Sequence, residues 1–333
     1  MVETAGGAAR RLLASIDRHP GRVVADGRLP LAHPLDADWR FTRDSAEHIL
    51  DRLLARTPAA ADILLIAMPT IALAAHDRGL MHRIVVASRI GDPIDLALRK
   101  VMPGCRFVSL QKVPMGAFQT VALDPPWYDD VALPIIEIAR AAALPNGRIF
   151  VCTPDTLTSP SSAKILSKLM SEPHEVGFSI VESVERIRYA TPFFELQCLK
   201  AAGISNVSPV WRTGLLCSCI PEPLEFPTCS VCPPVRGAWR EVRYGAIRIW
   251  LRQPAVQGPA AVGVADSISR TDRTRKIANL WTSGNTYVAG VDVIGLNLLS
   301  GTVDGAAQWP WENRLKAVLS DELATMEQAV EFW

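Results

Sequence analysis

An aspartate, two consecutive prolines and a tryptophan form the motif with the clearest chemistry, Asp124-Pro125-Pro126-Trp127, directly after the apolar run 118–123. Each proline ring fixes φ at about −65° and supplies no N–H, so the turn is rigid. The Asp124 carboxylate and the Pro125 carbonyl can accept hydrogen bonds from an amine and direct its lone pair toward an electrophilic carbon. Trp127 offers a ring for contact with a planar or cationic acceptor. The motif predicts group transfer to an amine nitrogen; a plain Pro-Pro turn with a buried Trp is the other interpretation.

The elements that must position this turn alternate between strands and helices. Apolar runs predict strands at about 61–66, 83–88, 118–123, 147–152, 178–188 and 210–217. Capping residues and helical spacing predict helices at about 4–17, 42–56, 70–77, 130–143 and 161–171. This alternation is typical of βαβ crossovers and a mostly parallel sheet, which is an α/β fold. Ligands bind beyond the carboxyl ends of the strands in such sheets, where the 68–70 turn and the Asp-Pro-Pro-Trp turn both begin.

The amino-acid composition changes after residue 217, where prolines become frequent. Alternating strands follow at about 239–252 and 286–299, with Gly284-Asn285 as a hairpin turn, before a helix at about 312–330. We therefore expect three parts: an N-terminal helical extension at 1–58, an α/β domain at 59–216, and a β-rich C-terminal domain with a terminal helix at 217–333.

The motif resembles the catalytic turn of class I S-adenosylmethionine-dependent amino-methyltransferases. Other segments occur in the same order as in the N6-adenine-methyltransferase-like family, whose eukaryotic members methylate a lysine of elongation factor 1A: Trp39-Arg40-Phe41-Thr42, Leu64-Leu65-Ile66-Ala67-Met68-Pro69-Thr70 and Gly147-Arg148-Ile149-Phe150-Val151-Cys152-Thr153. The layout is also similar to branched-chain polyamine synthases, which transfer an aminopropyl group. The resemblance covers roughly residues 36–216. It implies a Rossmann-like, seven-stranded methyltransferase sheet with S-adenosylmethionine over the first strand ends.

The resemblance also implies which residues bind S-adenosylmethionine: Ala67, Met68, Pro69 and Thr70 after the first strand, and Ser88 and Asp92 after the second. Methyltransferases usually have a glycine-rich loop at the first place and an acidic residue at the end of the second strand. The first loop here has no glycine, and the carboxylate nearest to the second strand is Asp92. A neutral side chain cannot accept both ribose hydroxyl groups as a carboxylate does. A non-catalytic binding module that retains the fold is therefore an alternative.

Methyl transfer from S-adenosylmethionine to an amine nitrogen, on adenine N6 or a protein lysine, is the predicted function. Asp124 and Pro125 would orient the amine, and Trp127 would pack against the acceptor. We expect no metal in this chemistry, because a sulfonium methyl group is already electrophilic and positioning lowers the barrier. Aminopropyl transfer is the alternative enzymatic reading, with Asp129 and Asp130 adding acidic groups for a polycation. A nucleic-acid base, a protein lysine and a polyamine are all compatible acceptors.

Four cysteines form a C-x-C and C-x-x-C arrangement that could supply thiolates to zinc: Cys217, Cys219, Cys229 and Cys232. Cys217 lies in an apolar run, where a cysteine is usually a small buried hydrophobic residue. We therefore predict no metal site and keep zinc as the alternative.

Charge and composition narrow the choice of partners and compartment. The 35 Lys and Arg residues nearly balance the 34 Asp and Glu residues, so the net charge is +1 and bulk attraction to nucleic acid is excluded. The basic stretch 269–276 is more typical of a solvated loop than of a phosphate-binding patch. Seven cysteines are too few for a disulfide scaffold, and no apolar run reaches the ~18 residues of a membrane span. We expect a cytoplasmic protein without a membrane partner.

Overall fold

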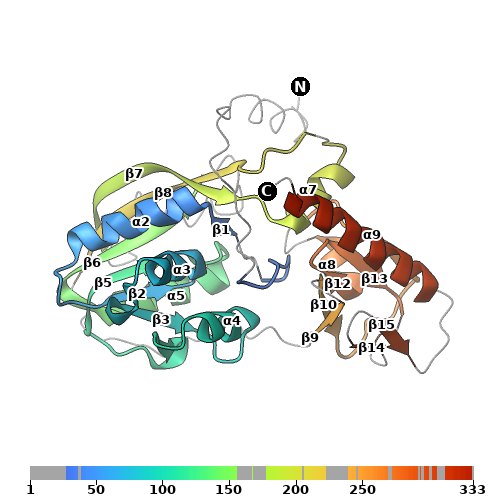
Figure 1. Cartoon of the computed structure of the whole chain (residues 1–333), viewed down its shortest axis with the longest axis horizontal. Helices are drawn as coiled ribbons and strands as arrows, with labels where there is room; N and C mark the ends of the chain where they lie inside the picture. Colours follow the sequence, from blue (N-terminus) through green and yellow to red (C-terminus); the bar gives the residue numbers. More distant parts are fainter. Residues whose placement is uncertain are drawn as a thin grey trace. The chain divides into compact units, whose positions relative to one another are not determined.

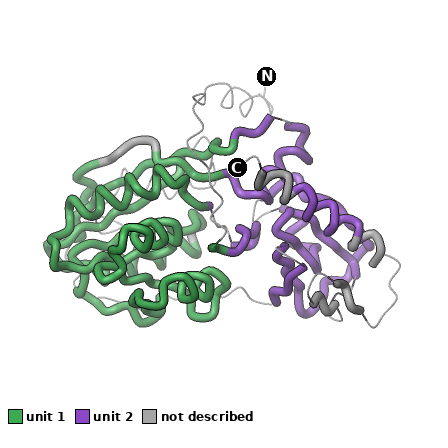
Figure 2. The backbone as a smooth tube through the Cα atoms, in the orientation of Figure 1, with its two compact units in different colours: residues 1–29, 40–190, 209–234 green, residues 30–39, 191–208, 235–333 purple. Residues whose placement is uncertain are grey.

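The computed structural model describes residues 28–36, 39–155, 167, 178–204, 206–222, 239–244, 247–268, 272–291, 293, 296–299, 302–305 and 312–331. Two compact units are present, shown in different colours in Figure 2. Unit 1 comprises residues 1–29, 40–190 and 209–234, and unit 2 comprises residues 30–39, 191–208 and 235–333. The predicted helix at 4–17, and that at 161–171 apart from Ser167, lie outside the described residues.

Unit 1 contains a mixed sheet whose described strands follow the order β1-β7-β8-β6-β5-β2-β3-β4 (Figure 1). The strands are β1 (Arg40–Phe41), β2 (Ile63–Ile66), β3 (Ile84–Ser88), β4 (Arg106–Ser109), β5 (Phe118–Leu123), β6 (Ala143–Pro154), β7 (Phe178–Ala190) and β8 (Arg212–Pro221). From β6 to β4 every neighbouring pair is parallel, whereas β8 runs antiparallel to both β6 and β7. The mostly parallel α/β fold is confirmed.

The predicted count of seven strands is wrong, because the described sheet has eight. The additional strand is β1, which has two residues and pairs antiparallel with the end of β7. Two residues are too short to show the period-2 alternation by which a strand is recognised in a sequence.

The helices of unit 1 are α2 (Arg43–Arg56), α3 (Pro69–Asp77), α4 (Pro93–Val101) and α5 (Asp129–Ala142), with 3-10 turns η1 (Met81–Arg83) and η2 (Leu110–Lys112). Their starts follow ordinary capping chemistry. The Thr42 hydroxyl accepts the first-turn N–H of Ser45, and proline occupies the first position of α3 and α4. The predicted helices near 42–56, 70–77 and 130–143 are confirmed, whereas α4 and β4 were not predicted.

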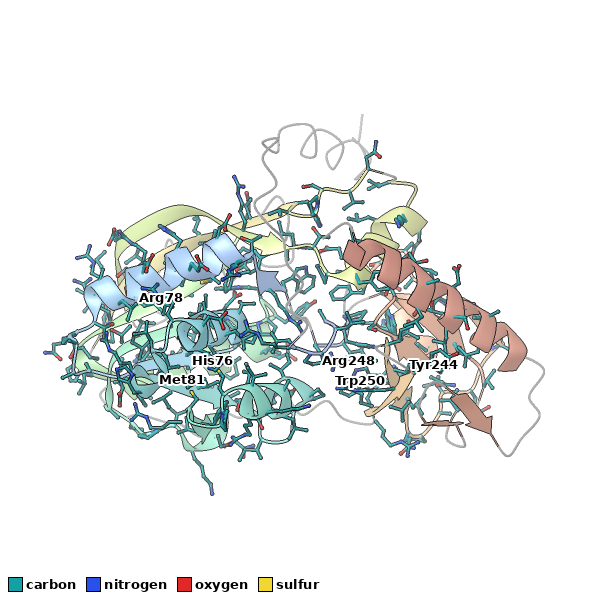
Figure 3. All side chains as sticks on the ribbon, viewed as in Figure 1. His76, Arg78, Met81, Tyr244, Arg248 and Trp250 are labelled. Carbon is teal, nitrogen blue, oxygen red and sulfur yellow. The ribbon has the colours of Figure 1, made fainter. Side chains whose placement is uncertain are left out.

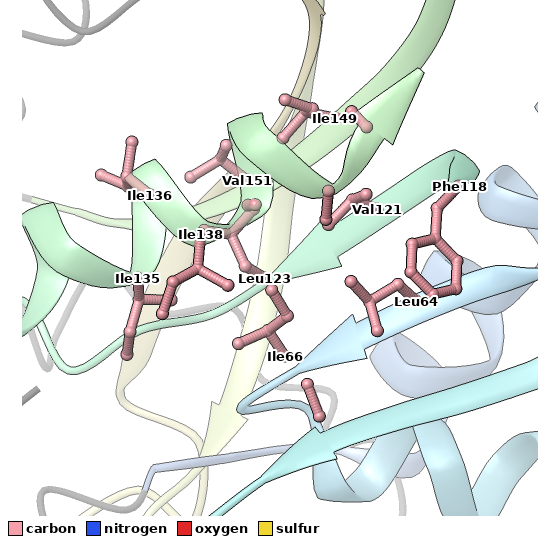
Figure 4. Packing of buried hydrophobic residues seen from close by; sticks show 14 of the residues in the cluster. Leu64, Ile66, Phe118, Val121, Leu123, Ile135, Ile136, Ile138, Ile149 and Val151 are labelled. Atoms are coloured by element: carbon pink, nitrogen blue, oxygen red, sulfur yellow. The ribbon is translucent and has the colours of Figure 1, made fainter. Parts of the chain in front are cut away.

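One layer of the core of unit 1 lies between α5 and one face of the sheet (Figure 4). Val121 and Leu123 of β5 point to this face, where Ile135 and Ile138 of α5 pack against them. Thr120, one position earlier, points to the opposite face and hydrogen-bonds Thr57 at the end of α2 at 2.7 Å. The sheet is therefore covered by helices on both faces, and only its strand ends are left to form a site.

Unit 2 contains an antiparallel sheet with described strands in the order β11-β13-β12-β10-β9. Its strands are β9 (Trp239–Tyr244), β10 (Ile247–Arg252), β11 (Ala261–Val264), β12 (Ala278–Thr282) and β13 (Thr286–Ala289), with a separate pair β14 (Leu296–Leu299) and β15 (Thr302–Gly305). Its helices are α7 (Phe193–Ala201), α8 (Arg273–Ile277) and α9 (Glu312–Glu331). The predicted hairpin turn at 281–285 is confirmed, since it joins β12 to β13.

Segments far apart in the sequence meet inside unit 2. The Trp39 indole donates a hydrogen bond to Glu195 of α7 at 2.9 Å, and its ring meets Phe194 edge-on. On β10, the fully buried Arg248 forms ion pairs with Asp36 at 2.6 Å and Glu241 at 2.8 Å. Burial alone would lower the pKa of Arg248, but these two carboxylates raise it.

Trp250 lies beside Arg248 on β10 (Figure 3), with the guanidinium 5.9 Å from the ring centroid. The Arg248 guanidinium also donates to the Leu31 carbonyl at 2.7 Å. The segment around residues 31–36 is thus attached to the sheet of unit 2 by buried polar contacts. No helix among the described residues combines the length and apolar character that a membrane span requires.

Candidate active site at the carboxyl edge of the sheet

The carboxyl ends of four strands of unit 1 lie along one edge of its sheet. Ile66 of β2 pairs with Leu123 of β5, which pairs with Val151 of β6. Because β8 is antiparallel to both β6 and β7, β7 also ends at this edge. The turns that follow β2 and β5 are therefore neighbours, as the sequence predicted.

The Asp-Pro-Pro-Trp turn is attached to the end of β2 by its own backbone. The Asp124 N–H donates to the Ile66 carbonyl at 3.2 Å, which continues the β2–β5 ladder by one residue. Pro125 is buried, and the Pro126 carbonyl accepts the N–H of Tyr128 at 2.8 Å. These contacts place the half-buried Asp124 side chain directly after β5, in the turn that leads to α5.

A tyrosine that lies 65 positions later in the sequence contacts this aspartate. Tyr189 is the second-last residue of β7, at the same edge of the sheet. Its hydroxyl lies 3.1 Å from Asp124 Oδ1 and donates a hydrogen bond to it. Burial, the negative charge of Asp124 and the neighbouring Cys152 raise the pKa of Tyr189 well above 10. The phenol therefore stays protonated and acts as a hydrogen-bond donor throughout the physiological pH range.

Cys152 of β6 is the third titratable group of this cluster, and it is fully buried. Burial, with smaller contributions from Asp124 and Cys217, raises the pKa of the Cys152 thiol well above its ordinary value of 9.0. A neutral, inaccessible thiol is a poor nucleophile. Tyr189 and Cys152 are therefore neutral neighbours of the Asp124 carboxylate.

Trp127 lies mainly in the core of unit 1. Its side chain is 8% exposed and belongs to the cluster that contains Leu123 and Ile135. The indole Nε1 is buried and has no hydrogen-bond partner within the described structure. Contact between Trp127 and an acceptor stays a prediction, and only the small exposed part of the ring is available for it.

The β2–α3 turn has the backbone of a glycine loop without a glycine. Ala67 is exposed and has φ +56°, in the left-handed region that glycine favours. Met68 is buried, and Pro69 begins α3. The Thr70 hydroxyl oxygen is buried and has no hydrogen-bond partner among the described residues. The turn thus adopts a conformation that costs about 1–2 kcal/mol for alanine.

Ser88 is the last residue of β3 and lies next to the β2–α3 turn, and Asp92 stands at the start of α4. The parallel register pairs Ile66 with Ala87, so Ala67 and Ser88 follow side by side. The Asp92 carboxylate accepts the Ile94 N–H at 3.3 Å and caps α4.

Sequence reasoning missed Asp95, the buried carboxylate that contacts the end of β3. Asp95 accepts hydrogen bonds from the Ser88 hydroxyl at 2.5 Å, the Gly91 N–H at 3.1 Å and Arg99 at 2.9 Å. Its side chain is 1% exposed, so it holds the β3–α4 turn together. The i,i+4 spacing of Asp95 and Arg99 was the available signal.

The cysteine arrangement does not assemble within the described residues. Cys217 and Cys219 lie on β8 with their side chains in the core, and Cys229 and Cys232 lie outside the described residues. Burial and the neighbouring Cys217 raise the pKa of the Cys219 thiol to about 12. No group of three or more metal-ligating side chains is found in the described part of the chain.

The acidic residues proposed to bind a polycation, and the basic stretch 269–276, are also only partly described by the structure. Asp130 is exposed at the start of α5, whereas the side chain of Asp129 lies outside the described ones. Of the basic stretch, Arg275 donates to the Pro34 carbonyl at 2.5 Å and lies 5.6 Å from the Trp281 ring, both within unit 2. Arg275 thus has a structural role there.

No protein-family model and no curated protein matches the chain. Among solved structures, it is similar to the branched-chain polyamine synthase of Thermus thermophilus in complex with N4-aminopropylspermidine and 5′-methylthioadenosine, at 18% identity, with a TM-score of 0.44 and 69% of each chain covered. A mutein of that enzyme has 18% identity and a TM-score of 0.45, and the match spans 65% of this chain and 64% of the mutein.

Several methyltransferases are also similar to the chain. A geranyl diphosphate methyltransferase in complex with S-adenosylmethionine has 12% identity and a TM-score of 0.35, with 54% of this chain and 85% of that chain covered. The glycopeptide N-methyltransferase MtfA in complex with sinefungin has 10% identity and a TM-score of 0.36, with 54% and 94% covered. Similarity at this level assigns neither a family nor an activity to the chain.

Proposed function

We propose that unit 1 binds S-adenosylmethionine at the carboxyl edge of its sheet and transfers the methyl group to an amine nitrogen. The observation that carries this proposal is the fixed position of the Asp124 carboxylate. Its backbone is held to Ile66 and its side chain to Tyr189, at the edge where parallel sheets bind ligands.

The β2–α3 turn supports a cofactor site beside this carboxylate. Ala67 adopts the conformation of a glycine, and Met68 gives the start of α3 no side-chain cap. Backbone N–H groups in the first turn of a helix favour an anionic group, such as the carboxylate of an amino-acid cofactor. The Thr70 hydroxyl is a further group that a ligand would satisfy. Ser88 and Asp92 would lie next to the ribose, by the neighbouring strand end.

The chemistry requires little beyond orientation. S-adenosylmethionine supplies a methyl carbon that its sulfonium charge makes electrophilic, and the sulfur keeps the electron pair of the carbon–sulfur bond. Asp124 accepts an N–H of the incoming amine, so that the nitrogen lone pair points to that carbon and forms the new carbon–nitrogen bond. Asp124 would also accept the proton that the methylated nitrogen loses.

Calorimetry and a transfer assay on the full chain test the proposal. S-adenosylmethionine should bind with a dissociation constant in the micromolar range. Radiolabelled methyl should then pass to an adenine-containing oligonucleotide, to a lysine-rich protein or to spermidine, and the labelled acceptor identifies the class. Asp124→Asn should lower kcat by ~10²-fold or more with unchanged cofactor affinity. Asp44→Asn, at an exposed position on α2, is the matched control.

The two alternative functions, aminopropyl transfer and non-catalytic binding, each predict a different outcome of this experiment. Transfer from decarboxylated S-adenosylmethionine to a polyamine, without methyl transfer, would assign the chain to aminopropyl chemistry. A folded chain that gives no heat with millimolar S-adenosylmethionine would leave only the non-catalytic binding module.

A further inference from the structure

Tyr189 and Asp124 belong to different strands at the same edge, and their side chains meet at a hydrogen-bonding distance of 3.1 Å. We propose that Tyr189 is a positioning residue, whose hydroxyl holds the Asp124 carboxylate in the orientation that accepts the amine. This inference rests on the proposed function and adds to it a residue that does not belong to the Asp-Pro-Pro-Trp motif.

A glycine in β8 makes room for the tyrosine ring. A Cβ atom on Gly214 would lie 2.4 Å from the Thr153 carbonyl oxygen and 3.2 Å from Cε2 of Tyr189. Real Cβ atoms do not approach backbone oxygen so closely, so a side chain at 214 would push β6 or the ring aside. The absence of a side chain therefore lets the Tyr189 ring lie against β8 on its way to Asp124.

The opposite side of the ring is also fixed. Phe41 of β1 pairs with Tyr189 in the antiparallel ladder, and their ring centroids are 4.8 Å apart. With 4% of its side chain exposed, Tyr189 has little freedom to rotate. A hydroxyl that cannot move away from a carboxylate restricts the rotation of that carboxylate, which is the kind of support that a reactive group requires.

The groups around the pair determine that Tyr189 donates this hydrogen bond and Asp124 accepts it. Cys152 of β6 and the phenol itself are neutral, because burial and the Asp124 charge raise both pKa values. Arg212, the β8 residue paired with Tyr189, is a positively charged neighbour that opposes the rise in the pKa of Tyr189, with a smaller effect than burial and Asp124. The proton therefore stays on Tyr189, and the hydrogen bond stabilises ionised Asp124.

A double-mutant cycle on the full chain tests the inference. Tyr189→Phe removes only the hydroxyl and should lower kcat by about 10-fold or more, while S-adenosylmethionine affinity stays within about 2-fold. In an Asp124→Asn background, the same substitution should cost almost nothing, since Tyr189 acts through Asp124. Tyr287→Phe on β13 of unit 2 is the matched control and should not change kcat.

The pH profile gives a second readout, which applies even if Asp124→Asn has no measurable rate. Loss of the donor destabilises ionised Asp124, so Tyr189→Phe should move the acid limb of kcat to higher pH by about one unit. A merely structural role for Tyr189 would not shift this limb.

The outcomes separate the inference from the proposed function. An active wild-type chain with additive effects in the cycle, or with an unchanged acid limb in Tyr189→Phe, overturns the inference alone. A wild-type chain that transfers no group overturns the proposed function, and the inference falls with it. Non-additive effects together with a shifted limb support both.

Discussion

The carboxyl carbon of Glu322 lies 2.3 Å from the position that a Cβ atom on Gly284 would occupy. Glu322 belongs to α9 and Gly284 to the turn between β12 and β13. The Thr282 hydroxyl donates to Glu322 Oε1 at 2.9 Å, and the Thr286 hydroxyl donates to the same oxygen. One buried side chain therefore attaches the last helix of unit 2 to a hairpin turn that has no side chain at its contact point.

Gly284→Ala should loosen this attachment. The new methyl group needs the space of the Glu322 carboxyl group, so we expect the free energy of unfolding to fall by about 1–3 kcal/mol. Gly258→Ala is the matched control, because a Cβ atom there would have no neighbour within 4 Å. Urea unfolding of both variants measures the difference; equal stabilities would show that α9 moves aside without cost.

The same carboxyl group predicts a pH dependence of stability. Burial raises the pKa of Glu322 from its ordinary 4.5 to about 7, with Asp321 adding to the rise and the hydroxyl groups of Thr286 and Thr282 opposing it. The folded chain therefore holds this proton more tightly than the unfolded chain. The resulting stabilisation is complete below pH ~4.5 and is lost as pH rises through about 7.

Glu322→Gln isolates this effect, because it keeps the side-chain shape and removes the titration. The free-energy difference between wild type and Glu322→Gln, measured by urea unfolding, should turn against the wild type as pH rises from 5 to 8. A difference that stays constant over this range would show that Glu322 titrates near its ordinary pKa.

Ala67→Gly should stabilise unit 1, although glycine substitutions usually destabilise. The positive φ of Ala67 costs about 1–2 kcal/mol, whereas the greater chain entropy of glycine costs about 0.5–1 kcal/mol. We expect a net gain of roughly 0.5–1 kcal/mol. Ala74→Gly, inside α3, should instead lose about 1 kcal/mol. Thermal unfolding of the two variants checks whether their stabilities change in opposite directions. A loss of stability in both would contradict the left-handed conformation of Ala67.

Arg248 should be among the least tolerant charged positions of unit 2. Arg248→Met removes the guanidinium from the buried carboxylate of Asp36 and from the partly exposed one of Glu241, at a cost of about 3–5 kcal/mol. Arg243 lies 3.5 Å from Glu241, but its side chain is 55% exposed. Arg243→Ala should therefore cost about 0–1 kcal/mol. Calorimetric unfolding of the two variants measures their stabilities. Similar losses of stability would contradict the idea that the buried Arg248 contributes more than the exposed Arg243.

Local sequence patterns predicted the elements that carry the candidate site, but not the contacts across the sheet. Thr42 marks the start of α2, and apolar runs mark β2 and β5, because capping and strand burial act over a few residues. The meeting of the turns after β2 and β5 at one edge follows from parallel pairing alone.

Long-range contacts escaped prediction for a physical reason. Tyr189 reaches Asp124 through the pairing of β6, β7 and β8, and no spacing in the sequence encodes that register. Arg248 would be assigned to the exposed side of a strand from its charge, yet Asp36, 212 positions earlier, accepts its hydrogen bond. The edge strand β4 was missed because it begins with the exposed Arg106 and lacks the fully buried apolar run that marks β2, a strand of the same length.

Unit 2 is assembled from three separate lengths of chain, 30–39, 191–208 and 235–333. During synthesis the first two lengths leave the ribosome before the sheet of unit 2, so Asp36 lacks its partner Arg248 of β10 until residues 235–333 follow. A fragment that ends before residue 235 would carry both lengths without the sheet of unit 2. Such a fragment should aggregate or be cleaved by proteases within these two lengths. A shortened form of unit 1 therefore needs residues 30–39 and 191–208 replaced by brief polar linkers.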